Sequence, residues 1–231
     1  GNTFGRMYEP RYLTGMVAGS TTESNLLGYV APFPIPEVIR GINAFALGVR
    51  SVNPDAQVEV IWTDTWLDPA VEGDLAQVLL DEGADVIAMH QESPATGKKA
   101  EVAGARWVSY NSDMSSFAPR AFLTAPVWDW GPRYVEIIEA AKTGTYEPGS
   151  YWGSMADGVV DIADIAADVD AGVTAAVADK KAAIIAGDFD VFSGPINDQY
   201  GYLVVAAGET MDDSSMLVMD FFVEGVIGSI G

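Results

Sequence analysis

Four aromatic side chains fall at or near the carboxyl ends of predicted strands, namely Phe33, Trp66, Tyr110 and Trp128. A planar heterocycle is held well between aromatic faces, because stacking is favourable by about 0.5–1.5 kcal/mol per pair beyond the burial of area. The alternative for any single ring is that it fills the core between helices and sheet. The coincidence of several rings at one predicted sheet edge favours a binding site for a flat ring.

Polar side chains that could bond the edge of such a ring occur at similar positions. His90 and Asn111 each follow a predicted strand, and Asp113 closes the stretch "YNSD". A carboxylate accepts strong, charge-assisted hydrogen bonds from ring N–H or amino groups. Asp113 could equally cap the next turn, and His90 could equally be a structural residue. Trp62, inside its strand, and Trp107 are expected to lie in the core.

Other kinds of site chemistry find little support in the sequence. The chain has one histidine and no cysteine, which excludes disulfides, thiolate metal sites and cysteine nucleophiles. It contains no EF-hand loop, no His-Glu-x-x-His motif and no Walker A loop. A G-x-S-x-G nucleophile elbow is also lacking. We therefore expect no cofactor, no dedicated metal site and no enzymatic activity.

The composition describes an acidic globular protein of 231 residues. Hydrophobic residues make up 49% of the chain and charged residues 19%, which suffices for a sizeable core and argues against disorder. The formal net charge of −21 repels nucleic acid and anionic lipid headgroups, so we expect no nucleic-acid partner. No apolar run reaches the ~18 residues of a membrane-spanning helix.

Strand-like and helix-like segments alternate through the central part of the chain. Such alternation predicts an α/β fold, in which a parallel sheet is covered by helices on both faces. Two helices are expected to begin at Pro36 and at Pro69, with Asp68 as the N-cap of the second. Ligands of such sheets bind outside the carboxyl ends of the strands. The predicted strands cover residues 25–32, 58–64, 84–90, 106–111 and 121–128.

The two ends of the chain follow a different pattern. Residues 9–19 resemble a helix with no strand before it. An apolar helical face is expected near residues 134–141, ending at Gly144. Extended structure, a helix and a hairpin are expected next, and a closing helix after them. These four segments cover residues 150–165, 169–187, 193–209 and 212–228.

Five sequence blocks, in order along the chain, are similar to a known protein family. They are "FGRMYEPRYLTGMVAG", "GYVAPFPIPEVIRGINAFALGVRSVNPDAQVEVIWTDTWLDPA", "YNSDM", "FLTAPVWDWGP" and "MDFFVEGVIG". They resemble the basic-membrane-protein family of ABC-transporter solute-binding proteins, of the purine-nucleoside receptor type. The resemblance covers essentially the whole chain.

The resemblance implies a type I periplasmic-binding-protein-like fold, with two Rossmann-like lobes joined by a hinge. It implies that residues 1–24 are a remnant of the first lobe and that residues 25–125 form the second lobe. Residues 126–231 would return to the first lobe and include the hinge crossings, the hairpin and the closing helix. The first lobe would then be incomplete at its N-terminus, and we expect ligand binding by this chain to be weakened or absent unless the missing segment is supplied in another way.

The resemblance also assigns roles to individual residues. Trp66 would stack on a purine, and Asn111 or Asp113 would bond its polar edge. His90 occupies a strand end where relatives often have a Gly-rich turn, and it stays a ligand-binding candidate together with Phe33 because of their positions after predicted strands.

Trp128 stands about where nucleoside binders carry a ribose-contacting lysine. An indole cannot supply ammonium donors, but it can cover a flat base. This difference favours a purine base such as adenine over a nucleoside.

The implied partner is an ABC permease in the membrane. The implied location is periplasmic or extracellular, with the full-length protein anchored as a lipoprotein. The alternatives are a ligand-sensing domain of a regulator, a nucleoside-processing enzyme on the same fold, and an α/β domain whose aromatic residues only fill its core.

Overall fold

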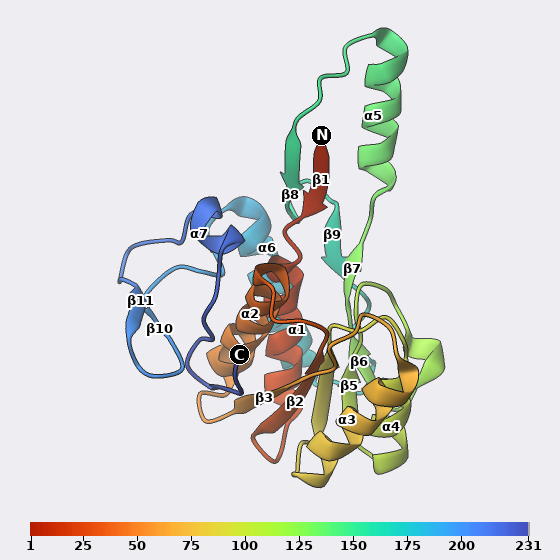
Figure 1. Ribbon diagram of the computed structural model, residues 1–231, viewed down its shortest axis with the longest axis vertical. Coiled ribbons are helices and arrows are strands. Elements are labelled where there is room, and N and C mark those ends of the chain that lie inside the picture. Colours follow the sequence, from red (N-terminus) through yellow and green to blue (C-terminus); the bar gives the residue numbers. More distant parts are fainter. Residues whose placement is uncertain (231) are drawn as a thin grey trace.

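A six-stranded, wholly parallel sheet forms the centre of the computed structural model, which describes residues 1–230 (Figure 1). The strand order is β12-β3-β2-β4-β5-β6, so the chain winds outward in both directions from β2. This order confirms the predicted α/β fold with a parallel sheet. The strands are β2 (Leu26–Ala31), β3 (Gln57–Trp62), β4 (Val86–Met89), β5 (Arg106–Val108), β6 (Phe122–Thr124) and β12 (Val226–Ile227).

Helices cover both faces of this sheet. One apolar cluster joins the sheet to α1, α2 and α6, and a second joins it to α3 and α4. Strand β2 contributes to both, because successive side chains point to opposite faces: Tyr29 belongs to the first cluster and Val30 to the second. The helices are α1 (Tyr8–Thr21), α2 (Pro36–Val52), α3 (Pro69–Asp81), α4 (Ala95–Ala103) and α6 (Ala171–Ala186).

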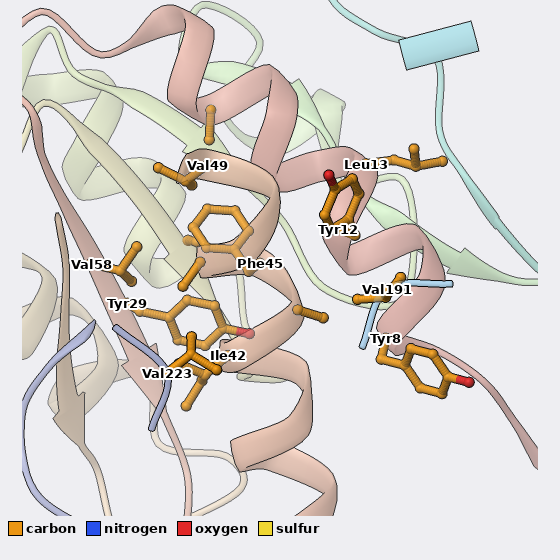
Figure 2. Close-up of a cluster of buried hydrophobic side chains, with 14 of the residues drawn as sticks. Tyr8, Tyr12, Leu13, Tyr29, Ile42, Phe45, Val49, Val58, Val191 and Val223 are labelled. Carbon is orange, nitrogen blue, oxygen red and sulfur yellow. The ribbon is translucent and has the colours of Figure 1, made fainter. Parts of the chain in front are cut away.

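Helices α1 and α2 pack backbone against backbone on the first face. A Cβ on Gly48 would lie 2.0 Å from the carbonyl oxygen of Tyr12, and one on Gly15 would lie 2.1 Å from that of Phe45. Figure 2 shows Tyr29 and Phe45 in the cluster between the sheet and these helices. Trp107, expected in the core, is fully buried in the second cluster.

The predicted starts of α2 and α3 are confirmed. Pro36 and Pro69 occupy the first helical turns. Asp68 caps α3 by accepting hydrogen bonds from the backbone N–H groups of Ala70 and Val71. The fully buried Glu72 carboxylate accepts in turn from the backbone N–H of Asp68.

An arm of the chain projects from this body (Figure 1). Its strands β1 (Asn2–Gly5) and β8 (Ser150–Gly153) pair in parallel, and β7 (Pro126–Trp128) pairs antiparallel with β9 (Val160–Ile162). The expectation that no strand precedes the first helix was therefore wrong. The predicted strand over residues 121–128 is two strands, since β6 stays in the body sheet and β7 leaves it.

Helix α5 (Gly131–Thr143) also lies in the arm and ends at a left-handed Gly144, as predicted. None of its side chains is buried by the described chain, and Tyr134 and Ile138 are exposed.

The position of α1 bears on the expected division of the chain. α1 packs against α2 and α6 beside the body sheet, whereas β1 lies in the arm. Only the first few of residues 1–24 are therefore remote from the sheet. The assignment of residue ranges to two lobes stays a prediction.

The C-terminal segment returns across the body. β10 (Ile196–Asn197) and β11 (Leu203–Val205) form the predicted hairpin. The predicted closing helix is wrong beyond its first turn, because α7 spans only Asp213–Leu217 and β12 then pairs with β3.

Two glycines and an aromatic contact explain why the predicted closing helix ends after its first turn. Gly225 and Gly228 have positive φ values of 91° and 139°, which break a helix. Phe222 is fully buried and stacks on Trp62 at 6.2 Å between ring centroids. Within residues 1–230, no helix is both long and apolar enough to cross a bilayer.

Candidate ligand-binding cleft

A hollow of about 430 Å³ lies where the carboxyl end of the body sheet meets the arm. This volume falls within the ~300–1,000 Å³ that is usual for small-molecule sites. We call the hollow the aromatic cleft, because six of its nine lining residues are aromatic. The lining residues are Thr3, Phe4, Glu37, Trp66, Tyr110, Asn111, Trp128, Trp130 and Tyr134.

Trp66 lies open at the wall of the cleft that the body contributes. Its side chain is 38% exposed, and its ring centroid lies 5.7 Å from that of Phe33 and 6.3 Å from that of His90. Hydrogen bonds hold the loop between β3 and α3 that carries it. The Thr63 hydroxyl donates to the Thr65 carbonyl at 2.8 Å and accepts from Gln91 at 2.6 Å. Together with the Asp68 cap, these bonds fix the start and end of the loop.

The arm supplies the other aromatic wall. Trp128 and Trp130 stack at 4.8 Å between centroids with an interplanar angle of 19°, and Tyr134 continues the stack at 6.4 Å. Phe4 meets Trp128 edge to face at 5.6 Å. A Cβ on Gly5 would lie 2.4 Å from the Trp128 ring, so a glycine is required where β1 passes this indole.

Glu37 and Asn111 bring hydrogen-bond acceptors that can bond a ligand edge. Glu37 lies in the first turn of α2. Asn111 follows β5 with a positive φ of 58°, and its buried Oδ1 has no hydrogen-bond partner among residues 1–230. An amide oxygen and a carboxylate both accept hydrogen bonds from ring N–H and amino groups.

The charge of Glu37 is set by its neighbours. Burial raises the pKa of Glu37, but the His90 imidazole and, to a lesser degree, the positive charges of Arg11 and Arg40 outweigh it, so the pKa lies below its ordinary value. Burial lowers the pKa of His90, and the two arginines lower it further against an opposing effect of Glu37. At neutral pH we therefore treat Glu37 as a carboxylate and His90 as a neutral imidazole. The cationic neighbours of Glu37 are then Arg11 and Arg40.

The structure brings some predicted residues together and separates others. Trp66, Asn111 and Trp128 line the cleft. Phe33 supports Trp66 from outside the lining, and His90 is 1% exposed behind Tyr110, with ring centroids 4.3 Å apart.

Asp113 lies elsewhere. Its side chain is exposed and accepts a hydrogen bond from the backbone N–H of Ser115 at 2.8 Å, where a short 3₁₀ helix (Ser115–Phe117) begins. This hydrogen bond corresponds to the turn-capping role that the sequence offered for Asp113 as the alternative to ligand binding. Among the described residues, no group of three or more His, Asp or Glu side chains is arranged to hold a metal ion.

Sequence reasoning missed several lining residues. Trp130 could have been found, because it is two residues from Trp128 and side chains two apart share one side of an extended segment. Glu37 carried a weaker signal, since acidic residues are common in the first turn of any helix. Phe4 lies on a strand that was not predicted.

A second hollow of about 680 Å³ adjoins the aromatic cleft and shares Phe4 and Glu37 with it. Its wall holds Trp152, and the guanidinium groups of Arg6 and Arg40 lie 4.5 Å and 4.8 Å from the centroid of that ring. Arg6 is also bonded at 2.7 Å to both carboxylate oxygens of Asp213. We call this hollow the charged chamber.

Comparison with known proteins shows which family the sequence matches. Residues 1–187 match the family model described as ABC transporter substrate-binding protein PnrA-like.

Two curated relatives match nearly the whole chain. A protein of Brucella abortus named as purine-binding is 40% identical over 96% of the chain. A putative ABC transporter glucose-binding protein of Haloferax volcanii is 41% identical over 100% of it. The chain spans 63% and 56% of the length of these two relatives.

Solved structures share the fold. A transcriptional activator of the comK gene from Bacillus halodurans superposes with a TM-score of 0.73 at 23% identity, covering 81% of this chain and 65% of that one. An ABC transporter solute-binding protein from Aeropyrum pernix gives a TM-score of 0.70 at 15% identity, with coverages of 91% and 67%. The predicted fold, of the type I solute-binding proteins, is thereby confirmed.

Proposed function

Because the chain belongs to the family of PnrA-like ABC transporter substrate-binding proteins, we propose that it is the substrate-capturing component of an ABC importer. The expected resemblance to the basic-membrane-protein family is thus confirmed. Proteins of this family bind a substrate and do not convert it, so the chain is not an enzyme. We propose an ABC permease as its membrane partner and a location outside the cytoplasmic membrane. Attachment as a lipoprotein, which the resemblance implies for the full-length protein, stays a prediction.

The ligand that we propose is a purine base such as adenine. The observation that carries this proposal is the aromatic cleft, with Trp66 on the body wall and the Trp128–Trp130 stack on the arm wall. A flat ring between these walls would stack on both of its faces. Glu37 and Asn111 would accept hydrogen bonds from its amino and N–H groups. The relative from Brucella abortus, named as purine-binding, supports the same ligand class.

A hexose is the principal competitor, because the relative from Haloferax volcanii is named as glucose-binding. A hexose carries hydroxyl groups around its whole rim, and each one loses its hydrogen bonds to water on burial. Only Thr3, Glu37 and Asn111 are polar, non-aromatic residues of the cleft lining. This lining therefore suits a ring with polar atoms along one edge better than one with hydroxyl groups on all sides.

Capture would couple ligand binding to a movement of the arm against the body. The two walls of the cleft belong to these two parts, so a ligand that contacts both favours the closed arrangement. It shifts the equilibrium only by its preference for that arrangement. The closed form is then the one that we expect to dock on the permease.

Calorimetric titration of the chain with adenine, adenosine, guanosine and glucose tests this proposal. We expect adenine to bind most tightly. Tighter binding of adenosine would contradict the preference for a free base. Binding of glucose in place of adenine would overturn the purine assignment.

A further inference from the structure

Glu37 is the only carboxylate among the nine residues that line the aromatic cleft in the described chain. Its position depends on a buried layer behind the cleft wall, formed by His90 and Arg11. His90 follows β4, and its backbone N–H donates to the Val30 carbonyl at 2.8 Å. Arg11 lies on α1 and is fully buried. The layer thus joins α1, which carries Arg11, and α2, which carries Glu37, to the carboxyl edge of the sheet.

The His90 imidazole lies alongside α2. Its Nε2 is 3.4 Å from Oε2 of Glu37. On its other side, a Cβ on Gly41 would lie 3.6 Å from both Nδ1 and Cε1. Glu37 and Gly41 are four residues apart and so share one face of the helix. The ring is held at its face by Tyr110, at 4.3 Å between centroids.

The chemistry of the two partners favours one position of the imidazole proton. A carboxylate can only accept hydrogen bonds, and a neutral imidazole donates from one nitrogen alone. Nε2 is the nitrogen that faces Glu37, at 3.4 Å from Oε2, and neither ring nitrogen has a hydrogen-bond partner of good geometry among residues 1–230. The favourable arrangement is therefore a neutral imidazole with its proton on Nε2, which makes a polar contact with the carboxylate that is longer than an ordinary N–H···O hydrogen bond.

Arg11 supplies the positive charge of this layer. Its Nη1 donates to the Met89 carbonyl at 2.8 Å, while Nε and Nη2 have no hydrogen-bond partner in the described chain. Its guanidinium lies 4.9 Å from the centroid of the Tyr110 ring and 5.7 Å from that of Tyr29. A buried cation needs a compensating negative charge, and Glu37 is the acidic group that interacts with it.

We propose that His90 is a positioning residue which, backed by Arg11, holds Glu37 as an ionised acceptor directed at the aromatic cleft, and that the cleft thereby selects rings presenting N–H or amino donors. The selection of ligands rests on the function proposed above, but the arrangement of His90 and Glu37 does not. His90 need not touch the ligand.

The first test needs no ligand. The chain has a single histidine, so a long-range ¹⁵N–¹H spectrum of histidine-labelled protein contains one imidazole. We expect the neutral Nε2–H form at pH 7 in the folded chain, and the mixture typical of free histidine in urea. A neutral Nδ1–H form, or an imidazolium at pH 7, would overturn the proposal.

The second test is a double-mutant cycle measured as adenine affinity. We expect Glu37→Gln and His90→Phe each to weaken binding about tenfold, the size usual for a hydrogen bond to a charged group. Phe keeps the aromatic contact with Tyr110 but removes the donor. The double variant should bind no more weakly than Glu37→Gln alone. Independent losses that multiply to about a hundredfold would refute the coupling.

The two tests separate failure of this inference from failure of the proposed function. If adenine binds and Trp66→Ala weakens it while the cycle is multiplicative, the function stands and the positioning role falls. If the wild-type chain binds no purine, the proposed ligand falls and the imidazole spectrum alone decides the role of His90. Circular dichroism of each variant shows whether its fold is intact, and the spectrum of the wild-type chain requires no variant.

Discussion

Replacing Trp66 with alanine removes the aromatic wall that the body contributes to the cleft. The indole is 38% exposed and is held by Phe33 and by its own loop rather than by the core. Its loss should therefore change the fold little. Its loss should change binding strongly, because one face of the ligand loses its aromatic partner.

The magnitude follows from the stacking of one base face. Alanine substitution of an aromatic side chain that stacks on a base costs ~1–3 kcal/mol, which corresponds to about 5- to 150-fold in affinity. Phenylalanine at this position should restore part of the loss, because a smaller ring still covers part of the base. We expect Trp66→Ala to weaken adenine binding within that range and Trp66→Phe to fall between alanine and wild type.

The assay is calorimetric titration with adenine, accompanied by thermal unfolding of each variant. Tyr200→Ala is the matched control, since this aromatic residue is 76% exposed and does not line the cleft. It should bind adenine as the wild type does. The reasoning is refuted if Trp66→Ala binds adenine normally, or if it loses affinity only in proportion to a loss of folded protein.

Three further predictions concern the scaffold that holds the cleft. Burial raises the pKa of Glu9 to about 7, and a hydrogen bond from the backbone N–H of Met155 offsets this only in part. The folded chain therefore binds more protons than the unfolded chain between pH ~4.5 and ~7, so it loses stability as pH rises through this range. Glu9→Gln should remove that loss, worth up to about 3 kcal/mol above pH 7, and a melting-temperature difference from wild type that does not grow between pH 5 and pH 8 would contradict this. Gly48→Ala should destabilise the fold by ~1–3 kcal/mol, because its Cβ would lie 2.0 Å from a backbone oxygen of α1. Gly41→Ala in the same helix meets only ordinary contacts and should stabilise the fold by ~0.5–1 kcal/mol. Equal effects of the two variants in urea unfolding would show that helix packing does not decide the difference. Asp68→Ala removes the N-cap of α3 and should cost ~1 kcal/mol in the same assay, and unchanged stability would show that the cap contributes nothing.

Local sequence signals predicted the body of the fold well. The starts of α2 and α3 followed from proline and Asp68 alone, since capping and fixed φ angles act within a few residues. Trp66 and Asn111 were recognised because each follows a strand of a parallel sheet. Their presence in one cleft therefore follows from strand order and not from any contact between them.

The rest of the site depends on contacts between distant segments. Phe4 reaches the cleft because β1 crosses from the arm, and no local pattern reveals such a crossing. Residues 212–228 have a helical cap and apolar residues, but pairing of β12 with β3 prevails over helix formation. Asp113 shows the opposite case, because its local hydrogen bond to the backbone of Ser115 matches the turn-capping alternative that was predicted beside ligand binding.

A crystal structure of the chain with adenine would test the central claim most directly. The account predicts the purine between Trp66 and the Trp128–Trp130 stack, with its amino or N–H edge within hydrogen-bond distance of Glu37. Adenine bound outside the aromatic cleft, or in it with a ring acceptor facing the Glu37 carboxylate, would contradict the account.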